Sequence, residues 1–280
     1  MTFSLLAYNV DQAYREEKFA ETRWDTRSPA IKSAIAAEDA DVVVLLELRD
    51  LDTSKETARA FLADPLFSKY DVVTRRYNHV TGFFQMALLF KPDVFFAGDV
   101  RTYQLGKDPE KSRLLMIVDL QHKATMRWVS VGVAHFDPSE AAKWDSVRSV
   151  VKTVQSQPHP IAIYADCNFF DELEGIEQRK ALLETCRDIA HPLYSDDGTI
   201  LSGTFPGFAH DEQKKSVDRM SRLNHIITPI DSEFMLLPVS PAVSPRYTCY
   251  SHENSNYQTF THPSDHLPIL VRIGIASRKQ

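Results

Sequence analysis

The chain has 280 residues, of which 43% are hydrophobic and 25% charged, a composition typical of a soluble globular protein with enough apolar material for a large core. The net charge of −6 argues against binding nucleic acid mainly through an excess of positive charge, although a bound divalent cation would reverse the local field. The three cysteines, Cys167, Cys186 and Cys249, are widely spaced and form neither a disulfide framework nor a zinc-finger pattern.

The N-terminus does not have the features of a secretory signal, because its apolar run is short and no positive charge precedes it. No apolar stretch reaches the length of a membrane span, and free thiols suit a reducing compartment. The chain also contains no repeat, low-complexity tract or linker. We therefore expect a single domain over residues 1–280 in a cytoplasmic protein that is a monomer.

The chain opens with alternating strands and helices. Residues 3–9 and 41–46 are apolar runs, and the second is rich in β-branched residues, which is typical of a buried strand. A Ser-Pro pair at residues 28–29 predicts a helix start, with the serine as N-cap and the proline in the first turn. Residues 53–56 have the spacing of a capping box, which predicts a second helix.

The middle of the chain changes character. Short connections between apolar runs indicate mainly antiparallel strands, with residues 98–112 as the one place for a helix-length spacer. These strands are expected over residues 70–74, 83–90, 114–120 and 127–136.

The remainder returns to mixed elements. A helix is expected from Ser139, a strand over 161–164 and another helix over about 175–186. A loop-rich stretch follows, and then strands over residues 223–228, 234–239 and 267–273. The predicted fold class is α/β (α+β), with two mixed, mainly antiparallel sheets between helical layers.

Five predicted strands border polar residues that could carry out chemistry. These are Asn9, Glu47, His135, Asp166 with Asn168, and Asp265 with His266. Each has an ordinary explanation when taken alone, such as a turn, a solvated strand end or a histidine satisfied in the core. Strand termini bring such groups to one edge of a sheet, however. Carboxylates, amides and imidazoles without thiolates favour magnesium or manganese over zinc.

Seven segments, in order, resemble motifs of the endonuclease/exonuclease/phosphatase superfamily, the DNase I-like metal-dependent phosphohydrolases. Residues 8–10 and 41–48 resemble its first two motifs, and residues 131–137 resemble its "NTHLD" segment. The later matches are residues 165–168 to "GDFN", 204–208 to "TFHGF", 222–227 to "RIDHI" and 264–268 to "SDHxP". The resemblance spans about residues 3–273 and implies a four-layer α-β-β-α sandwich.

The resemblance also implies roles for individual residues. Glu47, with Asn9 and with Asp265 through water, would hold Mg²⁺ or Mn²⁺. Asp166 would orient or deprotonate the attacking water. Donors to the phosphoryl oxygens would be Asn168, His135 and His266.

One position departs from the family pattern. Asn224 stands where the family has an aspartate that orients the catalytic histidine, here His266. An amide can hold the ring but does not stabilise an imidazolium, which could slow the reaction by orders of magnitude. Either His266 acts as a neutral donor, or the enzyme is slower or differently tuned, or Asp218 takes the aspartate's place.

The implied reaction is metal-dependent hydrolysis of a phosphate ester, foremost of the phosphodiesterase or nuclease type, with nucleic acid or a nucleotide as a candidate partner. The alternatives are a phosphomonoesterase acting on a sugar, inositol or nucleotide phosphate, and a catalytically attenuated binding module. Substrate contacts are predicted at Arg23, at Arg113 and at Tyr250, whose ring could stack on a base.

Overall fold

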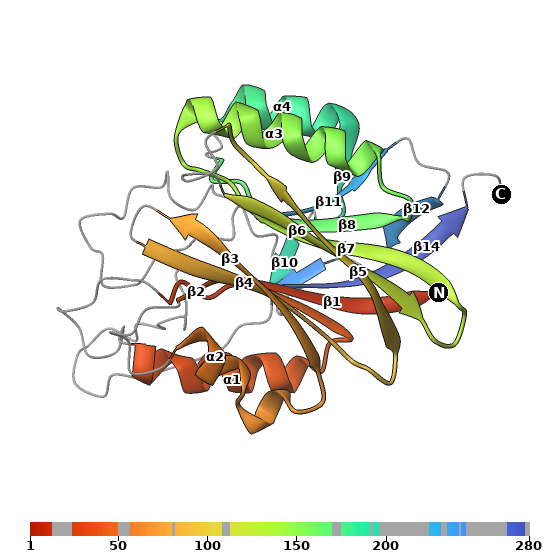
Figure 1. Cartoon of the computed structure of the whole chain (residues 1–280). Coiled ribbons are helices and arrows are strands. Elements are labelled where there is room, and N and C mark those ends of the chain that lie inside the picture. Colours follow the sequence, from red (N-terminus) through yellow and green to blue (C-terminus); the bar gives the residue numbers. More distant parts are fainter. Residues whose placement is uncertain are drawn as a thin grey trace.

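The computed structural model describes residues 1–12, 24–49, 57–79, 82–107, 113–169, 175–190, 193–195, 224–230, 234–240, 242–244 and 268–277. Within these residues, two β-sheets pack face to face and helices cover the outer face of each (Figure 1). The predicted α-β-β-α sandwich of two mixed, mainly antiparallel sheets is confirmed.

The larger sheet has eight strands in the described part of the chain, in the order β10-β13-β14-β1-β2-β4-β3, with β12 also pairing with β14. β1 runs parallel to β2 and antiparallel to β14, so the first and last strands are neighbours. The bounds are β1 Thr2–Asn9, β2 Val42–Arg49, β3 Asp71–His79, β4 Gly82–Phe90, β10 Leu193–Ser195, β12 Phe234–Pro238, β13 Ala242–Ser244 and β14 Ile269–Ser277.

The smaller sheet has six strands among the described residues, in the order β5-β6-β7-β8-β11-β9. β7 and β8 are parallel and are joined by a crossover helix, whereas their other neighbours pair antiparallel. The bounds are β5 Phe95–Gln104, β6 Leu114–His122, β7 Arg127–His135, β8 Ile161–Asp166, β9 Cys186–Asp188 and β11 His225–Pro229.

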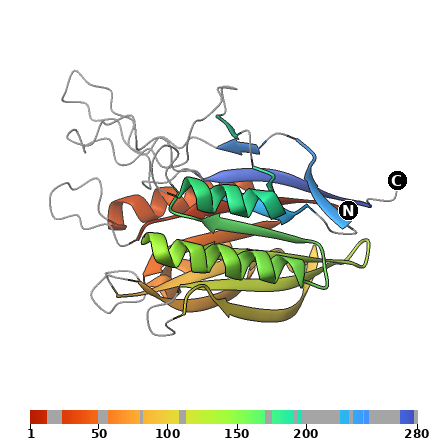
Figure 2. The same ribbon diagram turned by 90° about the horizontal axis from the view of Figure 1, so that it is seen from above.

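The helices lie on the two outer faces (Figures 1 and 2). α1 (Trp24–Glu38), α2 (Ala58–Leu62) and the 3-10 helix Pro65–Phe67 cover the larger sheet, and α3 (Glu140–Gln155) and α4 (Ile176–Thr185) cover the smaller one. Three apolar clusters result, one between the sheets and one beneath each helical layer. No helix in these described ranges combines the length and apolar character needed to cross a membrane.

Three local expectations are wrong. The N-cap of α2 is Thr57, whose hydroxyl accepts the backbone N–H of Ala60 at 3.2 Å, rather than a residue of the capping box predicted at 53–56. α1 begins at Trp24 rather than at Ser28, and Pro29 lies inside it. The earlier start is stabilised by tertiary contacts, since the Trp24 ring packs 5.4 Å from that of Phe61. The stretch assigned to a helix-length spacer contains β5, an edge strand whose side chains are mostly exposed and therefore show no buried-strand pattern.

Candidate active site

Four of the predicted site residues point into the space between the two sheets, three of them by strand alternation and Glu47 through a β-bulge. In β1, Leu5 and Ala7 belong to the inter-sheet core whereas Leu6 and Tyr8 face the α1 layer, so Asn9 points inward. Asn9 is the last residue of β1 and is fully buried. The polar side chain at the end of β1 therefore lies in the space between the two sheets.

Glu47 reaches the same space through a β-bulge. The register of β2 against β4 shifts between Leu45 and Leu48, and Glu47 adopts a positive φ of 60°. Without the shift, alternation would turn Glu47 toward the helices. Instead Leu48 faces the helices and Glu47 joins Leu46 on the inner side. A left-handed glutamate costs about 1–2 kcal/mol, so local strain accompanies this placement.

The smaller sheet supplies His135 and Asp166 from adjacent parallel strands. The two residues are register partners at the ends of β7 and β8, because parallel strands finish at the same edge of a sheet. Val133 and Tyr164, two residues earlier in each strand, belong to the inter-sheet core, so both side chains point inward. Each is only 3% exposed.

The amide of Asn9 links carboxylates from the two sheets. Its Nδ2 donates to Oε1 of Glu47 at 2.9 Å and to Oδ2 of Asp166 at 2.8 Å. Its Oδ1 accepts the backbone N–H of Asp11 at 3.1 Å, which assigns the amide orientation. Asn9 thus presents nitrogen, not oxygen, to the two acids. Its assignment as a direct metal ligand stays a prediction, and the geometry favours a spacing role.

His135 is held from behind by two donors. Its Nδ1 lies 2.8 Å from Nη1 of Arg113 and 3.1 Å from the hydroxyl of Tyr77, while its Nε2 lies 3.6 Å from Oε1 of Glu47. Potential ligand atoms of Glu47, His135 and Asp166 all lie within 4.8 Å of one another. Burial is the main cause that raises the pKa of Tyr77 well above its usual value, followed by the nearby charge of Glu47.

Asn168 and Asn224 border this cluster. Asn168 has a φ of 50°, its backbone N–H donates to Oδ1 of Asp166 at 3.1 Å, and its amide donates to the carbonyl of Phe136 at 2.8 Å. Asn224 donates to the hydroxyl of Tyr164 at 2.8 Å. Burial and then the charge of Asp166 raise the pKa of Tyr164 well above its ordinary value.

The remaining predicted residues fall outside the described residues. They are Arg23, Tyr250, Asp265 and His266, together with Asp218 as the alternative to Asn224. Arg113 is described, but it is 2% exposed and lies behind His135, so direct contact with substrate stays a prediction. Sequence reasoning missed Tyr77 and Tyr164, whose aromatic rings within apolar strands gave no separate signal.

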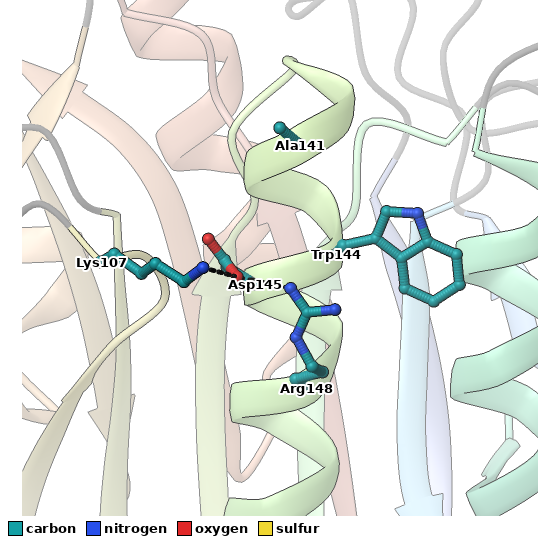
Figure 3. Close-up of a pocket in the computed structure, with 5 residues that line it drawn as sticks. All are labelled: Lys107, Ala141, Trp144, Asp145 and Arg148. Carbon is teal, nitrogen blue, oxygen red and sulfur yellow. Dashed lines mark hydrogen bonds and ion pairs between the residues drawn. The ribbon is translucent and has the colours of Figure 1, made fainter.

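A shallow pocket of about 450 Å³ lies beside α3 and contains none of the predicted site residues (Figure 3). Its two cations, Lys107 and Arg148, both approach Oδ1 of Asp145, at 3.8 Å and 2.6 Å. Because one carboxylate lies between both positive charges, the pocket offers an anion little uncompensated charge. It is lined by Lys107, Ala141, Trp144, Asp145 and Arg148.

No model of a known protein family matches the chain, and no curated protein matches it. Solved structures do match over nearly its full length. An endonuclease/exonuclease/phosphatase family protein from Bacteroides thetaiotaomicron superposes with a TM-score of 0.71 at 17% identity, covering 98% of each chain. TDP2 of D. rerio, complexed with a single-strand DNA product, has a TM-score of 0.69 at 14% identity, covering 98% of this chain and 99% of that one.

A mannosyl-6-phosphatase from Bacteroides thetaiotaomicron has a TM-score of 0.66 at 16% identity, covering 98% of this chain and 99% of that one. These TM-scores establish the fold. Because the sequence identities are low, the reaction has to be argued from the site. The resemblance seen in the sequence is confirmed at that level. The chain has the DNase I-like fold of the endonuclease/exonuclease/phosphatase proteins.

Proposed function

We propose that the chain is a divalent-metal-dependent hydrolase of phosphate esters and that phosphodiesters are its preferred class. One observation carries this proposal: the carboxylates of Glu47 and Asp166, from different sheets, meet at a single amide in a buried site. Asp166 is buried and the Glu47 side chain is 13% exposed. Two poorly solvated carboxylates so close together repel each other, and a core built for stability alone would avoid them. A cation removes that repulsion.

The donor set fits Mg²⁺ or Mn²⁺. Glu47 and Asp166 offer carboxylate oxygens, the ligands that hard divalent cations prefer, and the donors from Asn9 keep the two acids apart and oriented. Cys167 and Cys186 both belong to the helix-side core cluster, away from this site, so they offer it no thiolate. When bound, the cation would polarise the phosphoryl oxygen and offset the charge that develops there.

The chain's own residues would position water and substrate. Asp166 accepts from Asn9 and from the backbone of Asn168, and these bonds fix the carboxylate that would orient or deprotonate the attacking water. His135 would donate from Nε2 to a phosphoryl oxygen, and Asn168 from the amide hydrogen that Phe136 does not take. Asp265, His266 and Asn224 complete the proposed site.

A substrate panel tests the proposal. Bis-p-nitrophenyl phosphate and a single-stranded oligonucleotide represent diesters, and p-nitrophenyl phosphate and mannose 6-phosphate represent monoesters, each with Mg²⁺, Mn²⁺ or excess chelator. We expect metal-dependent turnover of the diesters that Asp166→Asn abolishes. A preference for monoesters would favour the second candidate, a phosphomonoesterase, which the similarity to the mannosyl-6-phosphatase supports. Wild-type turnover no higher than that of Asp166→Asn would reject hydrolysis altogether.

The third candidate, an attenuated binding module, has its own test in Asn224→Asp. The hydroxyl of Tyr164 can rotate to donate to the new carboxylate, so we expect the substitution to be tolerated. If Asn224 attenuates catalysis through His266, kcat should rise and the pH–rate profile should shift. An unchanged profile would show that residue 224 does not tune the reaction.

A further inference from the structure

Two donors contact the ring of His135 on the side away from the two acids. Arg113 lies 2.8 Å from Nδ1, and a guanidinium has donors but no acceptor. The hydroxyl of Tyr77 lies 3.1 Å from the same nitrogen, and its oxygen interacts with the backbone N–H of Glu47, which leaves its hydrogen free to donate to His135. Nδ1 must therefore be an acceptor without a proton.

The proton of the ring then resides on Nε2, the nitrogen that lies 3.6 Å from Oε1 of Glu47. The opposite tautomer would set the N–H of Nδ1 against that of Arg113 at 2.8 Å, with no acceptor between two buried donors. Burial keeps Tyr77 protonated, because it holds the pKa of the hydroxyl well above its normal value, and this supports its part as a donor.

This arrangement is the reverse of that around a metal-binding histidine. A ligating histidine uses a nitrogen lone pair for the metal and donates its other N–H to a carboxylate or a carbonyl. His135 has donors where such an acceptor would have to lie, so ligation through Nε2 would break its contact with Arg113. His135 lies close enough to Glu47 and Asp166 to be taken for a third metal ligand. Its donors at Nδ1 argue against that role.

We infer that Arg113 and Tyr77 are positioning residues that hold His135 with its Nε2–H toward the site, which keeps the imidazole out of the metal-ligand set and available as a hydrogen-bond donor. The tautomer follows from the contacts of Nδ1 with Arg113 and Tyr77, while its consequence for metal choice and turnover rests on the proposed function. An all-oxygen ligand set selects magnesium or manganese, whereas an added imidazole would shift the preference toward zinc.

Nuclear magnetic resonance of ¹⁵N-histidine-labelled protein tests the tautomer directly, with the His135 signals identified by their loss in His135→Gln. We expect Nδ1 to resonate as an unprotonated acceptor and Nε2 as a protonated nitrogen, with and without Mg²⁺. A proton on Nδ1, or loss of the Nε2 proton on addition of Zn²⁺ to the wild type, would overturn the inference. This readout does not depend on turnover, so it remains decisive even if no ester is hydrolysed.

Variants test the two donors separately. Arg113→Met keeps the length of the side chain and Tyr77→Phe keeps the ring, and each removes a donor to Nδ1. We expect the double variant to bind Zn²⁺ about tenfold or more tightly relative to Mg²⁺ in equilibrium dialysis, with Zn²⁺ now displacing the Nε2 proton. We expect kcat to fall by about 10- to 100-fold, with little change in KM.

Matched controls remove an arginine and a tyrosine away from His135. Arg101→Met breaks an ion pair with Asp119, and Tyr70→Phe breaks a bond to the carbonyl of Ala40. Both controls should keep the wild-type tautomer and metal preference. If they change the Zn²⁺ preference as much as the double variant does, or if the double variant keeps the wild-type preference, the positioning role is wrong. Tyr77→Phe alone provides the milder test where Arg113→Met fails to fold.

Discussion

The smaller sheet carries two buried histidines, each beside a carboxylate, and they lie on opposite faces. His135 ends β7 and faces the larger sheet, where it meets Glu47, Asp166 and Asn9. His225 begins β11 and faces the helical layer, since it pairs with Ala165 and its ring lies 6.0 Å from that of Phe169, both members of the helix-side core. The direction in which each histidine points thus separates the proposed active site from the His225–Asp188 pair on the helix-covered face.

The hydrogen-bond partners of His135 and His225 also differ. Nδ1 of His225 lies 2.8 Å from Oδ2 of Asp188, and the other oxygen of that carboxylate accepts the backbone N–H groups of Ala190 and Ile226. In the described residues, Nε2 of His225 is buried without a hydrogen-bond partner. His135 instead presents Nε2 toward two acids. We therefore expect the acid beside His225 to fix local structure, whereas the acids beside His135 form the proposed site for a cation and a substrate.

The largest expected difference is between Asp166→Asn and Asp188→Asn. Loss of the Asp166 carboxylate should lower kcat by about 10²- to 10⁴-fold, the range attributed to a general base, with little effect on stability. Asp188→Asn should keep kcat within about threefold but lower the free energy of unfolding by about 1.5–3 kcal/mol, because it weakens a partly buried hydrogen bond that involves a charged group. Steady-state kinetics and urea unfolding on both variants measure the contrast. An equal loss of activity in both variants would show that the two acids do not differ in their catalytic importance.

The histidines themselves give the next contrast. His135→Gln should lower kcat by about 10²- to 10³-fold, as expected when a donor to the developing charge is removed. His225→Gln should leave kcat nearly unchanged and destabilise the protein by about 1–3 kcal/mol, since it removes a fully buried ring and its bond to Asp188. Thermal unfolding followed by circular dichroism, beside the same kinetic assay, checks both. A catalytic defect in His225→Gln would place that histidine in the reaction.

The smallest expected effect concerns the thiols of the helix-side core. Burial raises the pKa of Cys186 to about 12 and that of Cys167 well above its usual value. In a Cys249→Ser background, neither should react with Ellman's reagent at pH 8 until the protein unfolds, because the thiolate is the reactive form. Rapid reaction of Cys167 or Cys186 in the folded state would show that the reagent reaches the core beneath α3 and α4 and would contradict their burial.

The raised pKa of Cys186 also predicts a pH dependence of stability. The unfolded chain releases the thiol proton near pH 8.5, whereas the folded chain keeps it to about pH 12. The stabilisation is therefore complete below about pH 8.5 and decreases as the pH rises toward the folded-state pKa. We expect the Tm of the wild type to decrease slightly between pH 8.5 and 10.5. The decrease should be smaller in Cys186→Ala, which lacks the thiol. Identical decreases in the two proteins would contradict this.

The sequence predicted much of the site because strands and motifs coincide. Apolar runs ending in Asn9, His135 and Asp166 indicated polar groups at strand ends that meet at one sheet edge, and the structure brings them together with Glu47 from two facing sheets. The β-bulge that turns Glu47 inward was not readable, since a strand that is apolar on both faces hides its alternation. The proposed positioning role of Arg113 likewise depends on a contact with His135 across 22 positions.

Other features depended on tertiary structure as well. Tyr77 contacts His135 across 58 positions and Asn224 contacts Tyr164 across 60, and neither pairing has a local sequence signal. The motif around residues 222–227 also places Asn224 and His225 side by side in sequence, although they face opposite sides of the sheet. Only the phase of β11 distinguishes Asn224, beside the site, from His225, on the helix-covered face of the sheet.

The most direct test of metal-assisted hydrolysis at the inter-sheet site is the rate of bis-p-nitrophenyl phosphate cleavage by three proteins in parallel: the wild type, Glu47→Gln and Asp188→Asn. With Mg²⁺ or Mn²⁺, the wild type and Asp188→Asn should turn over the ester, and excess chelator should abolish both rates. Glu47→Gln should remain at background because it loses a carboxylate from the metal site. A wild-type rate indifferent to chelator, or a Glu47→Gln rate equal to that of the wild type, would contradict the proposed function.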